Sequence, residues 1–128
     1  MRLRWSSVNR FVTLQTKRNM YKIHVEVFIA AKVLENRQGT FTVAALKHFI
    51  KQEFGDERPG VTTHVTAHCV ANAPLNTARG YNFLWRLPRN ELRSFHPGND
   101  TPVAARRDLA WQPKTADVPV TYRYLLKG

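Results

Sequence analysis

The chain of 128 residues lacks the features that would place it outside the cell or in a membrane. It has one cysteine, so no internal disulfide can form, which favours a reducing compartment. No apolar run approaches the roughly 18 residues of a membrane-spanning helix. No continuous apolar stretch follows the first arginines, as a secretory signal would require. We therefore expect a cytoplasmic protein with no membrane partner.

Acidic residues are also scarce, because nine Asp and Glu stand against 20 Lys and Arg, for a formal net charge of +11. Residues 1–19 carry five cations and no acid, and residues 61–98 carry four arginines against Glu91. Such an excess indicates a polyanionic partner, since each neutralised phosphate releases counterions. The alternative is a basic surface with no ligand.

Motifs for catalysis are missing as well. The sequence has no glycine-rich phosphate loop, no nucleophile elbow and no paired-carboxylate pattern. The few carboxylates fall mostly on the predicted helix faces and leave little for acid–base chemistry. We therefore expect no enzymatic activity, no cofactor and no small-molecule ligand.

The length of the chain and its 43% of hydrophobic residues predict one globular domain. The sequence pattern adds a segment at each end of this domain. Residues 1–19 form a basic arm, which is a disordered segment, an edge strand, a transit peptide or sequence upstream of a true start at Met20. Residues 20–98 form the domain. Residues 99–128 form an extension that wraps over it, with Leu109 and Trp111 as anchors.

Apolar residues at helical spacing predict three helices in the first half of the domain. The first covers residues 20–36, with Glu26 on the face opposite its apolar stripe. The second runs from an N-cap at Thr42 to a stop at Gly55. The third covers residues 60–71, and its predicted buried positions are Val61, Val65 and Cys69.

A β-hairpin follows the helices. Residues 83–87 alternate as a strand should, residues 88–90 form the turn, and residues 91–95 return with Leu92 inward. A strand of one or two residues near Phe41 would separate the first two helices. This order predicts an α+β winged-helix fold, in which a helix-turn-helix core carries a hairpin wing.

The third helix carries the main functional prediction. A helix in the major groove of DNA reads base edges with short polar side chains near its N-terminal end. Thr62, Thr63 and Thr66 occupy that end. Because β-branched residues lower helix propensity, three threonines within five positions suggest a function. The alternative is an ordinary solvated helix face.

The hairpin carries the second prediction, since a wing tip reaches a groove or the phosphates beside it. We expect Arg89, Asn90 and Arg93 to contact the DNA backbone or the minor groove. The alternative, compatible with the first, is a charged edge that prevents aggregation of the sheet. Further predicted DNA contacts come from Lys47, Lys51 and Arg79.

The sequence HVTAH places His64 and His68 four residues apart, as in zinc metalloproteases, but Val65 stands where those enzymes have a glutamate. No cysteine or carboxylate cluster offers a third ligand, so we expect no metal site. Cys69 falls on the apolar stripe of its helix, where a thiol behaves as a small hydrophobic residue.

A series of local patterns runs from the third helix to the end of the hairpin. It comprises an apolar-x-Thr-His-apolar-Thr run, a cysteine, Asn-Ala-Pro, an aromatic-led hairpin and Pro-Gly. The residues are Val61, Thr63, His64, Val65, Thr66, Cys69, Asn72, Ala73, Pro74, Tyr81, Trp85, Pro97 and Gly98.

This series resembles an uncharacterised prokaryotic winged-helix-like family, whose members occur alone or attached to restriction-type nucleases. The resemblance covers residues 20–128. The chain departs from it at residues 88–90, where family members tend to have a glycine, and at Thr62, where a basic residue is common. The resemblance implies DNA binding by analogy of fold and implies no known reaction.

The sequence thus predicts a nucleoid-associated protein that binds double-stranded DNA and is compatible with a homodimer. A transcriptional regulator and a recognition module of a restriction or defence system both fit. Two other functions stay open. An exposed apolar patch on the first or third helix would favour a protein–protein adaptor. A preference for structured or single-stranded RNA would indicate an RNA-binding protein.

Overall fold

The computed structural model describes residues 21–55, 58–75 and 80–127. The predicted N-terminal arm therefore lies outside the described residues. The main elements are α2 (Ile23–Gln38), β1 (Phe41–Thr42), α3 (Val43–Phe54), α4 (Val61–Thr63), the π-helix η1 (His64–His68), β2 (Leu84–Arg86) and β3 (Glu91–Ser94). Short 3₁₀ turns complete the chain: η2 (Pro88–Asn90), η3 (Ala104–Arg106), η4 (Thr115–Asp117) and η5 (Val120–Leu125). The α+β class is confirmed.

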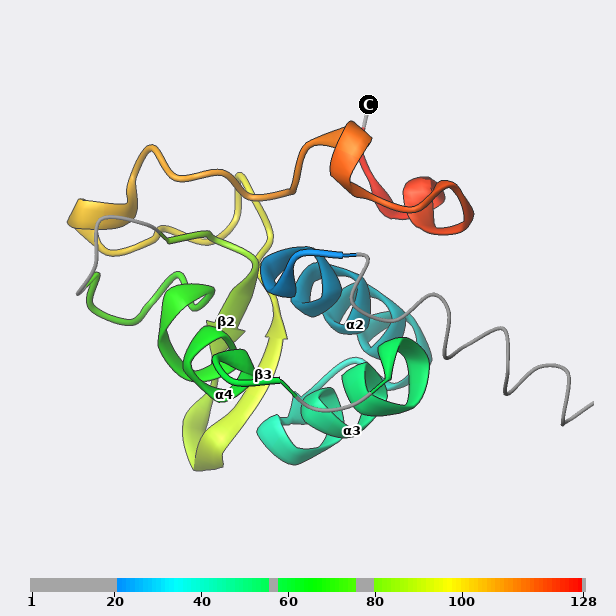
Figure 1. The fold of residues 1–128 in the computed structure, drawn as a ribbon. Coiled ribbons are helices and arrows are strands. Elements are labelled where there is room, and N and C mark those ends of the chain that lie inside the picture. The colour runs from blue at the N-terminus through cyan, green and yellow to red at the C-terminus, as the bar shows by residue number, and fades with distance from the viewer. Residues whose placement is uncertain (1–20, 56–57, 76–79, 128) are drawn as a thin grey trace, which may run out of the picture.

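The helices pack against one small antiparallel sheet with strand order β1-β3-β2 (Figure 1). In its register Arg86 pairs with Leu92 and Trp85 pairs with Arg93. Since side chains alternate along a strand, the buried Leu92 marks the face toward the helices, and Trp85 and Arg93 share the other face. The predicted turn and return strand are confirmed.

Thr42 links the sheet to α3. Its backbone pairs with β3, and its side-chain Oγ1 accepts a hydrogen bond of 3.0 Å from the backbone N–H of Ala45. This N-cap satisfies one of the backbone donors that a helix start leaves without a partner. The helix ends at Phe54, and Gly55 follows with a positive φ of 108°. Both predicted ends of this helix are confirmed.

The first helix is buried more widely than its sequence predicts. Glu26, expected on the outer face, is 1% exposed, so that prediction was wrong. The reason is that α2 contacts α3, the sheet and η5, which together cover more than one stripe of its surface. The Glu26 carboxylate forms an ion pair with Arg58, whose guanidinium also donates to the Tyr21 carbonyl.

The third helix is shorter than predicted and changes type after one turn. The backbone N–H of Cys69 donates to the carbonyl of His64, five residues back, which is the π-helical bond. The chain then leaves the helix to join the sheet, because Val70 forms a parallel bridge with Leu84 and Ala71 N–H donates to the Leu84 carbonyl at 2.8 Å. The predicted burial of Val61, Val65 and Cys69 is confirmed.

A buried arginine joins the C-terminal segment to the rest of the molecule. Arg106 is 1% exposed, and its guanidinium donates to the backbone carbonyls of Ala67, His68, Ala73, Pro74 and Tyr81 at 2.7–3.2 Å. Two of these carbonyls belong to the end of η1, where a cation is favoured by the helix dipole. Five acceptors for one guanidinium match its number of N–H donors.

The predicted anchors of the C-terminal segment were wrong in part. Trp111 is 39% exposed, and Leu109 is half-buried. Polar contacts hold this stretch instead, since Asn82 N–H donates to the Ala110 carbonyl and the Asn82 side chain donates to the Arg106 carbonyl, both at 2.8 Å. Further along, Val118 and Leu125 are buried in the core. Within the described ranges, no helix is long and apolar enough to cross a membrane.

Replacing Arg106 by methionine should destabilise the fold by at least about 3 kcal/mol, because buried carbonyls would lose their donors. The exposed neighbour Arg107 offers a matched control, and Arg107→Met should change the free energy of unfolding by no more than about 0.5 kcal/mol. Urea denaturation followed by circular dichroism measures both. Equal stability of the two variants would contradict the role given to Arg106.

Two buried groups should give opposite pH dependences of stability. Burial raises the pKa of Glu26 to about 7 from 4.5, so its contribution to stability falls as pH rises through this range. Burial, and to a smaller extent the charges of Lys22 and His64, lower the pKa of His24 to about 4 from 6.5. The contribution of His24 to stability therefore rises with pH. Between pH 4.5 and 6.5 the two effects oppose each other.

Glu26→Gln should therefore leave a melting temperature that rises more steeply from pH 4.5 to 6.5 than that of the parent protein. His24→Phe should tilt the same curve the other way. Each group contributes at most about 1.4 kcal/mol per pH unit. Thermal melts at three pH values across this window test the signs, and two variants with the same change of slope would disprove this account.

Candidate nucleic-acid interface

The third helix exposes two of its three threonines. Thr62 and Thr63 are exposed, whereas Thr66 is half-buried and its hydroxyl donates to the Thr62 carbonyl at 2.8 Å. This bond to the preceding turn occupies the Thr66 donor. Gly60 starts the helix with a φ of 96°, which favours glycine. The exposed polar surface therefore lies at the N-terminal end, formed by Thr62 and Thr63.

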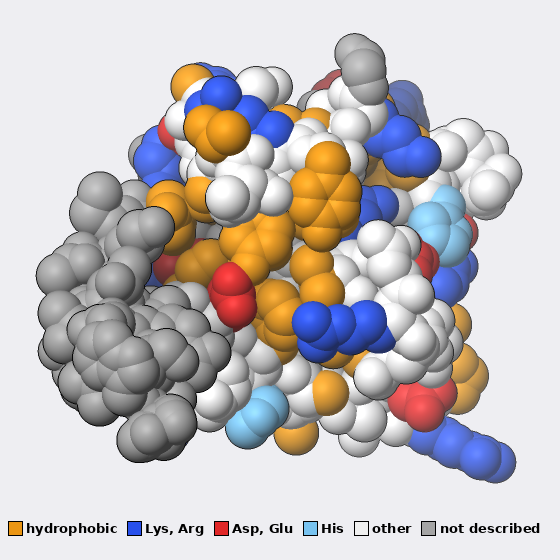
Figure 2. Space-filling view, turned by 90° about the vertical axis from the view of Figure 1, so that its right-hand side faces the viewer, with side chains coloured by type: hydrophobic (Ala, Val, Ile, Leu, Met, Phe, Trp, Pro, Cys, Tyr) orange, Lys and Arg blue, Asp and Glu red, His pale blue; other side chains and the backbone are white. Residues whose placement is uncertain are grey.

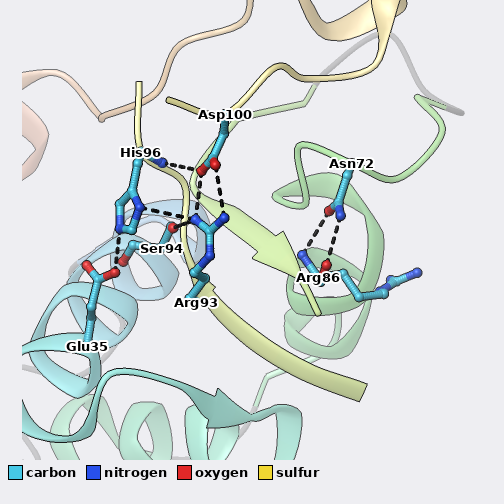
Figure 3. Close-up of polar contacts among 7 residues, drawn as sticks. All are labelled: Glu35, Asn72, Arg86, Arg93, Ser94, His96 and Asp100. Atoms are coloured by element: carbon cyan, nitrogen blue, oxygen red, sulfur yellow. Dashed lines mark hydrogen bonds and ion pairs between the residues drawn. The ribbon is translucent and has the colours of Figure 1, made fainter. Parts of the chain in front are cut away.

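The side-chain amide of Asn72 joins the end of the third helix to the hairpin. It pairs with the backbone of Arg86 as a neighbouring strand would. The side chain of Asn72 donates to the Arg86 carbonyl and accepts from the Arg86 N–H, both at 2.8 Å (Figure 3). The Arg86 guanidinium in turn donates to the Thr66 carbonyl. Because Arg86 is held through both its backbone and its side chain, the hairpin has a fixed position relative to the helix.

We call these contacts between Asn72, Arg86 and Thr66 the clamp, and the hairpin turn projects beyond it. Pro88, Arg89 and Asn90 are all exposed, and the Leu87 N–H donates to the Glu91 carbonyl at 2.8 Å below them. Arg89 and Asn90 have positive φ values of 67° and 62°. Asparagine tolerates this left-handed region, whereas arginine is strained there. The strained residue is therefore also the cation at the tip.

Arg93 lies elsewhere and is already paired. It belongs to the sheet face away from the helices, with its guanidinium 5.5 Å from the Trp85 ring centroid. Asp100 accepts from it at 2.7 and 2.9 Å (Figure 3). This hydrogen bond lowers the pKa of Asp100 and raises that of Arg93. The geometry does not support the predicted DNA contact of Arg93 beside Arg89.

Arg93 is also linked to the first helix, through His96. Arg93 also lies 3.2 Å from Nδ1 of His96, and Nε2 of that ring lies 2.7 Å from the Glu35 carboxylate (Figure 3). A neutral imidazole that accepts through Nδ1 and donates through Nε2 satisfies both contacts. Arg93 therefore has a structural role, which is to join β3 to α2 and to the segment after the hairpin.

The remaining predicted contacts come from α3 and from the loop before β2. Lys51 is exposed and Lys47 is half-buried. Both lie on α3, the helix that precedes α4 in the chain. Arg79 lies outside the described residues. The structure thus places Lys51 at the surface and leaves the other two positions without further support.

The two histidines of the third helix contact each other, and its cysteine is buried. His64 and His68 meet edge to face with ring centroids 4.9 Å apart, and burial lowers the pKa of His64. The described ranges contain no group of three His, Cys, Asp or Glu side chains that could hold a metal ion. Burial raises the pKa of the Cys69 thiol, which keeps it protonated.

Sequence reasoning missed the residues that hold the interface together. Asn72 reads as a helix-end or turn residue, Arg86 as one more cation of the hairpin, and Arg106 as part of the general basic excess. Two local signals were present, the Asn-Ala-Pro sequence and the alternation along β2. Neither indicates which groups these side chains bind. The partner of each is a backbone group, which carries no trace in the sequence.

No family model, no curated protein and no solved structure matches this chain. The resemblance to a winged-helix-like family therefore stays a prediction. The functional proposal rests on the geometry and charge of the described residues.

Two substitutions at the hairpin tip should separate strain from charge. Arg89→Gly removes the left-handed strain of about 1–2 kcal/mol, partly offset by the greater freedom of glycine when unfolded. It should raise the free energy of unfolding by up to about 1 kcal/mol. Arg89→Ala removes the same charge but keeps the strain, so it should not stabilise. Chemical denaturation compares them, and a stabilised alanine variant would show that the turn is not strained.

Proposed function

We propose that this chain is a winged-helix module that binds double-stranded DNA without catalysing a reaction. The observation that carries the proposal is the clamp of Asn72 and Arg86, which unites the exposed threonines of α4 and the hairpin tip in one rigid unit. A helix and a wing held in this way suit a duplex, whose groove and flanking backbone have a fixed spacing.

The order of elements supports the winged-helix assignment. Three helices are followed by a hairpin, and a two-residue strand between the first two helices adds to the hairpin sheet. In Figure 1 the hairpin tip extends past α4 on the same side of the molecule. In such an arrangement the third helix enters the major groove and the wing lies over the adjacent backbone.

The chemistry of the exposed residues matches this placement. Thr62 and Thr63 offer hydroxyl and methyl groups to base edges, and thymine methyls and base acceptors both suit threonine. Arg89 and Asn90 reach the phosphates or the minor groove from the tip, and Lys51 lies on the neighbouring α3. The net charge of +11 supplies the long-range attraction that brings DNA to the surface.

The proposal gives the protein a recognition role. A nucleoid-associated transcriptional regulator and a recognition module of a restriction or defence system both fit. The exposed side of α4 presents threonines rather than an apolar stripe. This composition favours DNA over a protein partner at that helix.

Fluorescence anisotropy with a labelled random-sequence duplex at 50 and 200 mM salt tests the proposal. We expect micromolar binding at the lower salt that weakens steeply at the higher one. Arg89→Ala and Arg89→Gly should weaken binding equally and lower the salt slope by about 1, since both remove one phosphate contact. Thr62→Ala and Thr63→Ala should alter sequence preference more than the salt slope.

Lys114→Ala, an exposed cation of the C-terminal segment, serves as the control and should leave binding almost unchanged. A single-stranded RNA and an RNA hairpin of equal length compete in parallel assays. Absence of duplex binding at low salt would reject the proposal, as would tighter binding to either RNA.

A further inference from the structure

A cluster of aromatic rings connects the start of α2, the end of α3 and the C-terminal turn. Phe54 lies at its centre, with ring centroids 5.8 Å from Tyr21, 6.5 Å from Phe49 and 6.2 Å from Tyr122. We call these four residues the aromatic patch. Phe54 is buried, and the other three are partly buried, so the rings form a continuous apolar area that reaches the surface.

The neighbouring turn η5 exposes two more large apolar side chains. On η5, Val120 is 75% exposed and Tyr124 is 71% exposed, which are high values for large hydrophobic side chains. Figure 2 shows hydrophobic side chains gathered in a band on this side of the molecule, with charged side chains beside it. Exposed apolar groups in one area mark interaction surfaces more often than they occur by chance.

Arg37 and Glu53 each contact a side chain of the patch. The Arg37 guanidinium lies 5.7 Å from the Phe49 ring centroid, and the Glu53 carboxylate accepts a hydrogen bond from the Tyr122 hydroxyl. The described residues contain no ion pair between Arg37 and Glu53. The area is therefore apolar at its centre, with Arg37 and Glu53 beside its rings, on a chain whose net charge is +11.

This pattern is complementary to itself. When two identical surfaces meet about a two-fold axis, each group of one copy faces a different group of the other. Arg37 of each copy can then approach Glu53 of the other, while the aromatic rings pack at the centre. Two cationic copies repel one another, so they can associate best at an apolar area where an acid of each copy faces a cation of the other.

We propose that the aromatic patch is the two-fold interface of a homodimer of this chain. In Figure 1, η5 and the end of α3 lie at the right of the molecule, whereas α4 and the hairpin tip lie at the left. Dimerisation leaves α4 and the hairpin open and presents two copies of them. The proposal does not depend on DNA binding.

Sedimentation equilibrium of the whole chain over a range of concentrations tests the interface by exchange of charge. The parent protein should show a reversible monomer–dimer equilibrium. Arg37→Glu and Glu53→Arg each create like-charge contacts at both symmetric positions, and each should raise the dimer Kd by tenfold or more. The double variant Arg37→Glu/Glu53→Arg restores opposite charges and should recover most of the affinity.

Arg107→Glu and Asp108→Arg are exposed sites that change the net charge by the same amounts, and they should leave the dimer Kd within about threefold of the parent value. Val120→Ser, at a side chain too exposed to support the fold, should weaken the dimer. Melting temperatures verify folding. A parent chain that stays monomeric at millimolar concentration overturns the proposal, as does a double variant no tighter than the single ones.

Discussion

The structure depends on one buried positive charge, the Arg106 guanidinium, whose hydrogen-bond acceptors among the described residues are backbone carbonyls. Arg106 brings its guanidinium from the C-terminal segment to carbonyls of η1, of the turn after it and of the chain entering β2. Burial of an unpaired charge is expensive, so the geometry of all its acceptors must be kept together. The third helix therefore has its end fixed by a residue far away in the chain.

This constraint explains why the third helix is irregular. In a regular α-helix through residue 71, the Ala71 N–H would bond to a carbonyl of its own helix, whereas here it donates to the Leu84 carbonyl. The π-helical bond from Cys69 to His64 ends the helix early, and the chain then pairs with Leu84. Asn72 follows at once and binds Arg86. The helix thus ends early, its last carbonyls bind Arg106, and Asn72 then binds Arg86. Each of these contacts fixes the position of the segment that follows it.

The sequence predicted the elements that local patterns determine. Thr42 and Gly55 limit α3 as expected, because capping depends on a few adjacent residues. The turn at Pro88 and the inward Leu92 follow from alternation and turn chemistry. Glu26 and Trp111 were misplaced, since the burial of one and the exposure of the other depend on segments distant in sequence. For the same reason the pairing of Arg93 with Asp100 could not be seen in a one-dimensional count of cations.

The amide of Asn72 holds the hairpin at its base, three residues before the middle of the turn. Residues 88–90 of the turn are exposed and lie outside the buried core. A turn attached in this way tolerates insertions, deletions and exchanges of side chain, while the scaffold below keeps its shape. Substitutions at residues 88–90 should therefore cost little folding free energy, provided that the new residue accepts the positive φ at positions 89 and 90.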